Sequence, residues 1–256
     1  MALPDITQQP RFTPDLWLAD SLGRPVYRLS SGAPIGSAGL LQAQMTSLAS
    51  RADAFFYAKL PTSDVRACLE LSRCGFGVVD TALTLSRDTS AGQTPGGVRL
   101  GIATTEQHAG VLRIADTCFR WSRFHLDPLI PLEAANRVKH RWLQSYLEGK
   151  RGSALYAAEA HGDVAGFLAV LESSQEGRRV AIIDLLGVAQ EHQGKGVGHA
   201  LVQLFIQDWR GRAEELRVGT QAANLRSLRL YEQNGFRMAA SDYVLHAHCR
   251  GGEIHR

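Results

Sequence analysis

Three glycines at alternate positions mark the part of this sequence best suited to bind an anionic ligand. Gly194, Gly196 and Gly198 lie between an apolar stretch, 180–188, and an amphipathic one, 197–209. Glycines let the backbone adopt positive φ and approach a ligand closely. The first amides of a helix that starts here would have no partner inside it, and the helix dipole favours negative charge at the same place. The turn therefore predicts a pyrophosphate site.

Two better-known phosphate loops fit this spacing poorly. A Walker A loop needs Ser or Thr directly after its lysine, but Gly196 follows Lys195. A dinucleotide fingerprint that starts at Gly194 needs a glycine where the chain has His199, and no βαβ unit follows. The turn alone leaves open that its glycines only join a strand tightly to a helix. What remains is the pattern Gln-x-x-Gly-x-Gly, from Gln193 to Gly198.

The turn belongs to a regular succession of elements. Apolar residues recur with helical spacing in some segments and form short runs between turn residues in others. In chain order we expect a helix at about 105–121, an irregular segment at 121–130, a helix after Pro131, strands at 154–159, 164–171 and 179–188, a helix at 197–209, a strand at 216–220, a helix at 224–234 and a closing strand pair. Turns at 161–163 and 173–177 make the three strands an antiparallel meander, and Gly235 ends the last helix as a C-cap.

The first half of the chain carries a similar rhythm. A shift of 160 positions aligns 54–76 with 214–236 without a gap, and both segments have the order strand, loop, helix, Gly-Phe. The first copy loses the chemistry of the second, because its residues at the matching positions differ: Ala33 for Gln193, Pro34 for Gly194, Ala38 for Gly198, Asp64 for Asn224 and Leu71 for Tyr231. A polar, Gly-rich stretch at 87–97 has the composition of a linker. We therefore expect domains at 1–90 and 98–256, joined by 91–97.

Composition excludes several classes of protein. A net charge of +3 without a basic block among aromatic residues does not favour nucleic acid. The N-terminus lacks the pattern of a signal peptide, and no run reaches about 20 apolar residues, so we expect a cytoplasmic protein without membrane contact. The four cysteines are scattered, which argues against a disulfide framework or a zinc cluster. His246 and His248 alternate without visible partner ligands, so no metal is expected.

The pattern at 193–198 resembles the coenzyme A loop of the GCN5-related N-acetyltransferases, the GNAT family, and the order of elements over 98–249 is similar to theirs. The resemblance implies an α+β fold with a mixed, mostly antiparallel central sheet flanked by helices, preceded here by a smaller degenerate half-GNAT α/β domain. It implies acetyl-coenzyme A (acetyl-CoA) as cosubstrate and direct transfer of acetyl to a primary amine. In this family the strand before the loop splays from the next strand, and the pantetheine arm lies between them.

The resemblance also assigns roles to single residues. Asn224 would bind the cofactor arm, and the Tyr231 hydroxyl would protonate the departing thiolate, since its ordinary pKa of ~10 keeps it protonated at neutral pH. Plainer roles stay open, as a helix N-cap for Asn224 and a core aromatic for Tyr231. The complete set expected to bind the cofactor is Leu186, Gly187, Val188, Gln193, Gly194, Lys195, Gly196, Val197, Gly198, Asn224 and Tyr231.

The acceptor is suggested by a narrower resemblance. Segments 119–128 (FRWSRFHLDP) and 139–152 (KHRWLQSYLEGKRG) resemble the sugar-nucleotide branch of the family, which implies a small-molecule amine on a nucleotide sugar. Arg123, His125 and Thr220 are the implied acceptor residues, and Arg123 could bind a phosphate or be a solvated surface arginine. The base is His125, which would titrate near neutral pH, or Asp184, on the strand face of Leu186 and Val188 and acting through water; a water chain alone is the third possibility.

Other functions stay open from the sequence. The acceptor could instead be an amino acid, a peptide N-terminus or an antibiotic amine. A module that senses acetyl-CoA without turnover is a reading of another class, although Asn224 and Tyr231 favour catalysis. The first domain could shape the pocket or make a homodimer through its sheet edge.

Overall fold

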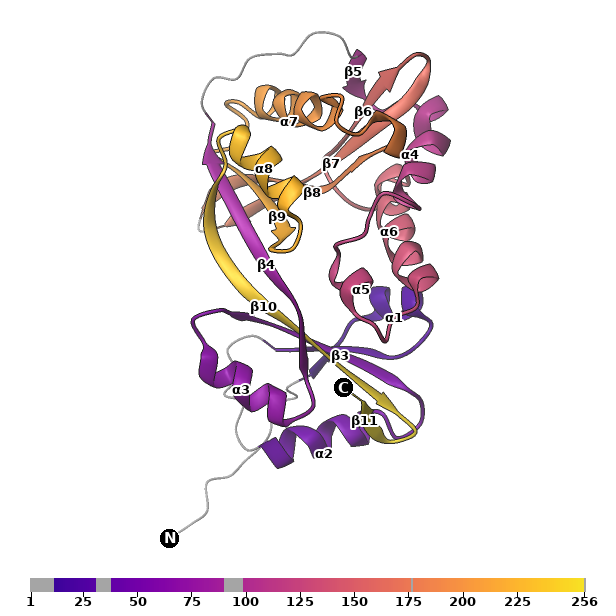
Figure 1. Ribbon diagram of the computed structural model, residues 1–256, viewed down its shortest axis with the longest axis vertical. Coiled ribbons are helices and arrows are strands. Elements are labelled where there is room, and N and C mark those ends of the chain that lie inside the picture. The colour runs from indigo at the N-terminus through magenta and orange to yellow at the C-terminus, as the bar shows by residue number, and fades with distance from the viewer. Residues whose placement is uncertain (1–11, 31–37, 90–98, 176, 256) are drawn as a thin grey trace. The chain divides into compact units, whose positions relative to one another are not determined.

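The computed structural model of this chain describes residues 12–30, 38–89, 99–175 and 177–255 (Figure 1). Its residues form two compact units, which are described separately. One unit comprises the chain up to Thr81 together with the segment from Asp242 onward, and the other comprises Ala82–Ser241. The candidate site lies in the second unit.

The second unit is a mixed sheet with helices on both faces. Every pairing in it that we describe is antiparallel except that of β8 with β9. In spatial order its strands are the first part of β10 (Arg237–Arg250), β4 (Gly77–Asp88, from Ala82 onward), β9 (Glu215–Gln221), β8 (Arg178–Val188), β7 (Asp163–Gln175), β6 (Ala154–Ala160) and β5 (Arg99–Ile102). The long meander β6–β7–β8 forms its centre, as the alternating apolar runs predict.

Helices lie on both faces of this sheet (Figure 1), and a separate hydrophobic core lies between the sheet and the helices on each face. On one face, α7 (Val197–Asp208) and α8 (Leu225–Gln233) pack on the strands, and Leu201, Phe205 and Trp209 are fully buried there. On the other face, α4 (His108–Ala115) and α6 (Leu132–Leu147) bury Val111 and Leu143 against β6–β8. Each helix thus presents one apolar stripe to the sheet, which is the source of its stability.

Two elements differ from the sequence prediction near the acceptor segment. The helix expected at 105–121 begins with a 3₁₀ turn, η1 (Thr105–Gln107), and its α-helical part, α4, ends at Ala115. The segment expected to be irregular contains a one-turn helix, α5 (Arg123–Leu126), for which Ser122 is the N-cap. The remaining predicted helices and strands of this unit are confirmed within a few residues, including the positive φ of 79° at Gly235 after α8. A 3₁₀ turn, η2 (Gln190–His192), follows β8.

The first unit is built on β3 (Ala54–Pro61). Its neighbours are β2 (Val26–Leu29), which runs parallel to it, and the second part of β10 (Arg237–Arg250), which runs antiparallel. The edge strands and helices of this unit are β1 (Phe12–Pro14), β11 (Glu253–His255), α1 (Leu16–Leu22), α2 (Ala38–Leu48) and α3 (Val65–Arg73). Its core joins Leu41 and Met45 of α2 and Leu71 of α3 to Phe56 of β3.

The two compact units do not follow chain order, because each half of the sequence contributes a strand segment to the other unit. Residues of β4 from Ala82 onward pair with β9 of the second unit, and residues of β10 from Asp242 onward pair with β3 of the first. A division at 1–90 and 98–256 follows chain order, whereas strand pairing joins residues far apart in sequence. The expected linker at 91–97 lies outside the described residues.

Candidate active site

The glycine turn has the backbone that an anion site needs. Gly194 and Gly196 have φ values of 78° and 83°, and a Cβ at either position would meet no atom within 4 Å. Both residues are exposed. Gly196 is the N-cap of α7 and offers no side chain to its first amides, and the first helical hydrogen bond runs from the Ala200 amide to the Gly196 carbonyl at 2.9 Å. The amides before Ala200 are therefore available to a ligand, where the helix dipole favours negative charge.

Gln193 fixes this turn to its surroundings. Its Nε2 donates to the carbonyl oxygen of Val188 at 3.1 Å, and its Oε1 accepts from Nη1 of Arg226 at 2.6 Å. The side chain thus links the end of β8 to the first turn of α8. Arg226 was not among the predicted site residues, because an exposed arginine in a helix gives no signal until its partner is known. It adds positive charge near the turn, as does the exposed Lys195.

The strand before the turn parts from its neighbour, as the family resemblance implies. β8 pairs with β9 from Val180 to Ile183 only, opposite Glu215 to Val218. From Asp184 onward β8 continues to pair with β7 but not with β9. Leu186 and Val188 are half-buried where the strands part, and both pack toward the α7 face. Backbone groups of β8 are left without a strand partner on the β9 side, which is where an extended ligand arm can bind.

Gly187 is required by packing in this same stretch. A Cβ at Gly187 would lie 2.5 Å from the Phe167 ring and 2.8 Å from Sγ of Cys118. Those distances are shorter than any real contact of a Cβ. Gly198 is less crowded, with Leu230 at 3.4 Å from a Cβ built there. Glycine at 187 therefore lets the segment after α4 approach β8 directly.

Tyr231 and Asn224 lie on α8 and at its start. Tyr231 is 4% exposed, packs edge-on against Phe236 and has a hydroxyl that makes no hydrogen bond to any described residue. Burial raises its pKa above the ordinary value, so the phenol stays protonated. Asn224 is the N-cap of α8, and its Oδ1 accepts from the Ser227 amide at 3.2 Å. The capping role that the sequence left open is thus present, and the amide nitrogen of Asn224 remains for a ligand.

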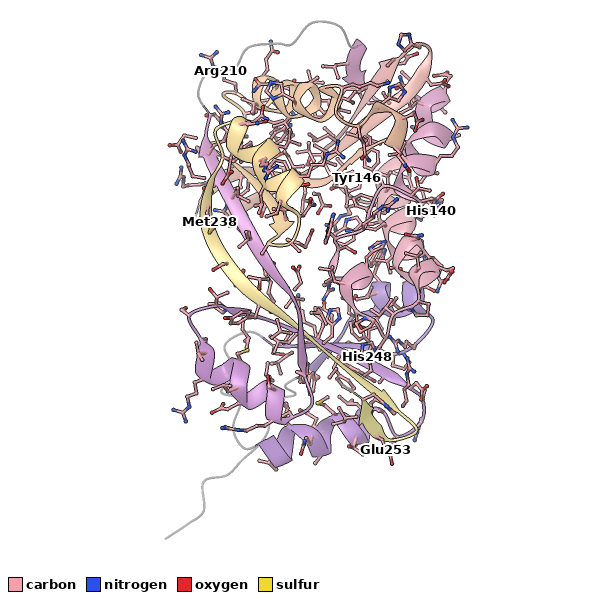
Figure 2. All side chains as sticks on the ribbon, in the orientation of Figure 1. His140, Tyr146, Arg210, Met238, His248 and Glu253 are labelled. Carbon is pink, nitrogen blue, oxygen red and sulfur yellow. The ribbon has the colours of Figure 1, made fainter. Side chains whose placement is uncertain are left out.

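Asp184 is the centre of a hydrogen-bond cluster. Its Oδ2 accepts from Nε1 of Trp142 at 2.9 Å, from the hydroxyl of Tyr146 at 2.6 Å and from Nε of Arg151 at 2.8 Å. Tyr146, labelled in Figure 2, lies on α6 as does Trp142. Burial acts to raise the pKa of the Asp184 carboxyl, but the bonds from Arg151 and Tyr146 outweigh it and lower the pKa. The carboxylate is therefore ionised, and its Oδ2 carries all three of these bonds.

The expected orientation of Asp184 is wrong. Alternation along β8 predicts that it shares a face with Leu186 and Val188, but it contacts α6 on the opposite face. The reason is a β-bulge: Val170 pairs with Ile183 and Ala169 with Leu185, so Asp184 is an extra residue in β8. A bulge shifts the alternation by one residue from that point on.

His125 lies in α5 with both ring nitrogens engaged. Nδ1 is 2.6 Å from Oγ of Ser122, and Nε2 is 2.9 Å from Oδ1 of Asn136. Because the amide oxygen can only accept, Nε2 carries the proton and Nδ1 accepts from the serine hydroxyl. Burial lowers the pKa of the imidazole, and the nearby Lys139 lowers it further. His125 is thus neutral at pH 7.

The other two predicted acceptor residues lie on separate elements. The guanidinium carbon of Arg123, at the start of α5, stacks 4.6 Å from the centre of the Phe124 ring. Thr220 is buried in β9, opposite Leu83 of β4. The structure brings Gln193 and Gly198 to the end of β8, beside Val188. It joins His125 to α6 through Asn136. No described hydrogen bond links Thr220 to that cluster.

Comparison with known proteins agrees with this geometry. Residues 111–236 match the acetyltransferase (GNAT) family. The chain is 29% identical over 195 residues to the spore coat polysaccharide biosynthesis protein SpsD of Bacillus subtilis (strain 168), a match that covers 75% of this chain and 66% of SpsD. It is 25% identical over 193 residues to the dTDP-fucosamine acetyltransferase of Escherichia coli O6:H1 (strain CFT073), covering 74% of this chain and 80% of that enzyme. The match thus spans just under two thirds of SpsD.

Solved structures share the fold. A GCN5-related N-acetyltransferase from Sphaerobacter thermophilus superposes with a TM-score of 0.61 at 15% identity, covering 93% of this chain and 76% of its own. A conserved protein of unknown function from Staphylococcus epidermidis gives a TM-score of 0.63 at 14% identity, covering 94% and 92%. The predicted GNAT fold is confirmed by these neighbours and by the mostly antiparallel sheet. Residues 111–236 are therefore a GNAT-family acetyltransferase domain.

Proposed function

We propose that this chain transfers the acetyl group of acetyl-CoA directly to a primary amine on a nucleotide-linked amino-deoxy sugar. The donor is the one that GNAT acetyltransferases use. One observation carries it here: the uncapped amides at the start of α7 lie directly after the stretch of β8 that has no β9 partner. The acceptor class rests on the likeness to the dTDP-fucosamine and spore coat polysaccharide proteins.

In this proposal the turn residues 193–198 bind the pyrophosphate through backbone amides, with positive charge from Lys195 nearby. The pantetheine arm lies along 186–188 and uses backbone groups there, and an amide in this stretch polarises the acetyl carbonyl. The amide nitrogen of Asn224 binds the same arm. The positive φ of Gly194 and Gly196 and the limited pairing of β8 support this placement.

Tyr231 acts as the acid. The neutral acceptor nitrogen forms a bond to the acetyl carbon, the carbon–sulfur bond breaks, and the sulfur takes the phenolic proton. The nitrogen releases one proton to the base, and the tyrosine regains a proton from water. A raised pKa keeps that proton on the phenol before the step, and the absence of a hydrogen-bond partner among the described residues leaves the hydroxyl free to donate. These two observations support the assignment over that of a core aromatic alone.

Of the two predicted bases, we favour His125 and assign Asp184 a positioning role. His125 is neutral at pH 7, and its Nδ1 accepts from the Ser122 hydroxyl. The proton of the acceptor amine reaches Nδ1 through that hydroxyl, which gives its own proton to the ring and takes the amine's. Asp184 accepts three hydrogen bonds with one oxygen and has a lowered pKa, which makes it a weak base. We infer that it orients Trp142, Tyr146 and Arg151 instead. Arg123 and Thr220 remain proposed contacts of the acceptor.

We also propose that the first unit is a degenerate half-GNAT domain without a cofactor site. Its β3–α3 segment repeats the β9–α8 segment in order. Asp64 caps α3 through a bond from the Ala67 amide, as Asn224 caps α8, and Gly75 has positive φ before Phe76, as Gly235 has before Phe236. Leu71 is buried at the position that corresponds to Tyr231. The glycine-turn equivalent is 33–38, of which 33–37 lie outside the described residues.

The test is a thiol-release assay with acetyl-CoA and a panel of amines. The panel contains a dTDP-linked amino sugar, the free amino sugar, an amino acid, a peptide with a free N-terminus and an aminoglycoside. We expect kcat/KM for the nucleotide sugar to exceed the others by at least about a hundredfold, because a site built around a ligand's polar groups rejects analogues that lack them. A higher kcat/KM for another amine of the panel would show that the acceptor belongs to that amine's class and not to the nucleotide sugars. Binding of acetyl-CoA without turnover of any amine would indicate a sensor.

A further inference from the structure

Lys139 is a buried cation that the mechanism above does not use. It lies on α6 and is 9% exposed. Its Nζ is 5.0 Å from the centre of the Phe119 ring and 4.7 Å from the Trp142 ring. Among the described residues the ammonium has aromatic faces as neighbours but no hydrogen bond and no ion pair.

A buried ammonium without hydrogen bonds is unusual, because burial of a charge is costly unless acceptors replace water. The carboxylate that acts on it most strongly, Asp184, already accepts from Trp142, Tyr146 and Arg151. Burial, Arg123 and Arg151 lower the pKa of Lys139 to about 8, while Asp184 and Cys118 act in the opposite direction. Lys139 is still mostly charged at pH 7. No oxygen atom of a described residue accepts from its three N–H donors.

The position of Lys139 connects it to the transfer site. Phe119, one of the two rings near the Lys139 ammonium, directly follows Cys118 in the chain. Cys118 in turn lies against Gly187 in β8. The ring of Phe119 is 6.4 Å from that of Phe167, which meets the same glycine. Lys139 also acts electrostatically on Cys118 and on His125. The ammonium thus lies on the α6 face of the stretch where β8 has no β9 partner, beside the acceptor segment.

We propose that Lys139 is an acceptor-binding residue whose ammonium, held between the rings of Phe119 and Trp142, donates hydrogen bonds to a hydroxyl oxygen of the acceptor near its reacting amine. This inference rests on the proposed transfer to an amino sugar. The substrate that Lys139 would recognise is an amine with a hydroxyl oxygen close to its nitrogen, as in an amino-deoxy sugar.

The same charge selects the reactive form of the acceptor. An acceptor ammonium beside the Lys139 ammonium in a water-poor site would suffer like-charge repulsion, so the neutral amine binds in preference. The groups that face Lys139 from neighbouring elements are Asp184, Arg151, Arg123, Cys118 and His125. Only Asp184 is an anion at pH 7, since burial raises the pKa of the Cys118 thiol to about 12. Because the amine binds without its extra proton, a separate base does not have to remove that proton before the attack.

The first experiment compares Lys139→Met with Lys150→Met in the complete chain. Lys150 is a matched control, because it is an exposed lysine close to α6 that pairs with Glu148. We expect Lys139→Met to lower kcat/KM for a dTDP-linked amino sugar on the order of tenfold to a hundredfold, mainly through KM, with unchanged affinity for acetyl-CoA. The acid limb of its pH profile should move to higher pH. Lys150→Met should match the wild type.

A second measurement uses only the wild-type protein, so it is independent of how the variant folds. The rate at which an amine-acylating reagent modifies Lys139 is followed by peptide mass spectrometry, with and without the dTDP-linked amino sugar. We expect the sugar to slow modification of Lys139 severalfold and to leave Lys150 unaffected. Turnover of the sugar with no protection of Lys139, or with Lys139→Met within twofold of wild type, would overturn the inference alone. Absence of turnover of any amino sugar would instead refute the proposed function.

Discussion

Arg151 and Asp184 form an ion pair in which Nε lies 2.8 Å from the carboxylate Oδ2, the same atom that accepts from Trp142 and Tyr146. The Oδ2 atom of Asp184, the extra residue of the β8 bulge, thus accepts hydrogen bonds from two residues of α6 and from Arg151, which follows that helix. Removing the carboxylate of this partly buried pair would leave the Trp142 and Tyr146 donors without their acceptor.

Asp184→Asn should therefore lower the stability of the fold more than it lowers the rate of acetyl transfer. We expect the free energy of unfolding to fall by about 1–3 kcal/mol, with kcat reduced less than tenfold. Asp208→Asn is the matched control, since Asp208 also accepts from a tyrosine and an arginine, Tyr156 and Arg212. Thermal denaturation and steady-state kinetics measure both. A hundredfold loss of kcat at unchanged stability would show that Asp184 is the base after all.

The lowered pKa of Asp184 predicts an acid-sensitive contribution to stability. Because the folded carboxyl binds its proton less readily than the unfolded one, its contribution is complete above the unfolded pKa of about 4 and is lost as pH falls through the lower, folded pKa. Denaturant titrations between about pH 5 and 2.5 should show a smaller pH dependence for Asp184→Asn than for wild type. Identical slopes in the two proteins would contradict this.

Gly187→Ala should disturb the site through packing. Its Cβ would collide with Phe167 and Cys118, so we expect a loss of about 1–3 kcal/mol of unfolding free energy. Cys118→Ala removes one of the colliding atoms, and the double variant should recover part of that loss. A double-variant cycle by chemical denaturation measures the coupling. Strict additivity would mean that the two side chains do not meet.

Tyr231→Phe should lower kcat by about a hundredfold or more without weakening acetyl-CoA binding, because the phenyl ring keeps the packing and loses only the proton donor. Tyr156→Phe serves as the control, since its hydroxyl bonds to Asp208 and Trp209 rather than to a ligand. That control should lose stability and keep kcat. Equal rates of thiol release in Tyr231→Phe and wild type would remove the tyrosine from the mechanism.

Local patterns in the sequence were sufficient to predict most of the second unit. The meander, the glycine turn and both α7 and α8 follow from periodicity and turn residues, which act over a few positions. The exchange of β4 and β10 between the units has no local signal, because it depends on pairing between residues more than 100 positions apart in sequence, such as Leu83 with Thr220. The orientation of Asp184 was missed for a related reason: one extra residue in β8 reverses the alternation.

Lys139 did have a signal that the sequence offers. It follows Ala135 by four residues and precedes Trp142 by three, so helical spacing places it on the apolar stripe of α6. A lysine among apolar positions usually extends its amine to water. Only the rings of Phe119 and Trp142 around Nζ show that this one is enclosed. Arg226 was missed because its bond to Gln193 joins two elements that are 33 residues apart.

The central claim is that the turn at 194–198 binds acetyl-CoA through its backbone, and calorimetric titration tests it most directly. Wild type should bind acetyl-CoA with measurable heat, and Gly196→Ala should weaken binding about tenfold or more, because an L side chain strains the positive φ of 83°. Gly211→Ala carries the same kind of strain, with φ of 74° after the other end of α7, and should bind like wild type. Folded wild-type protein that gave no heat with acetyl-CoA would contradict the account.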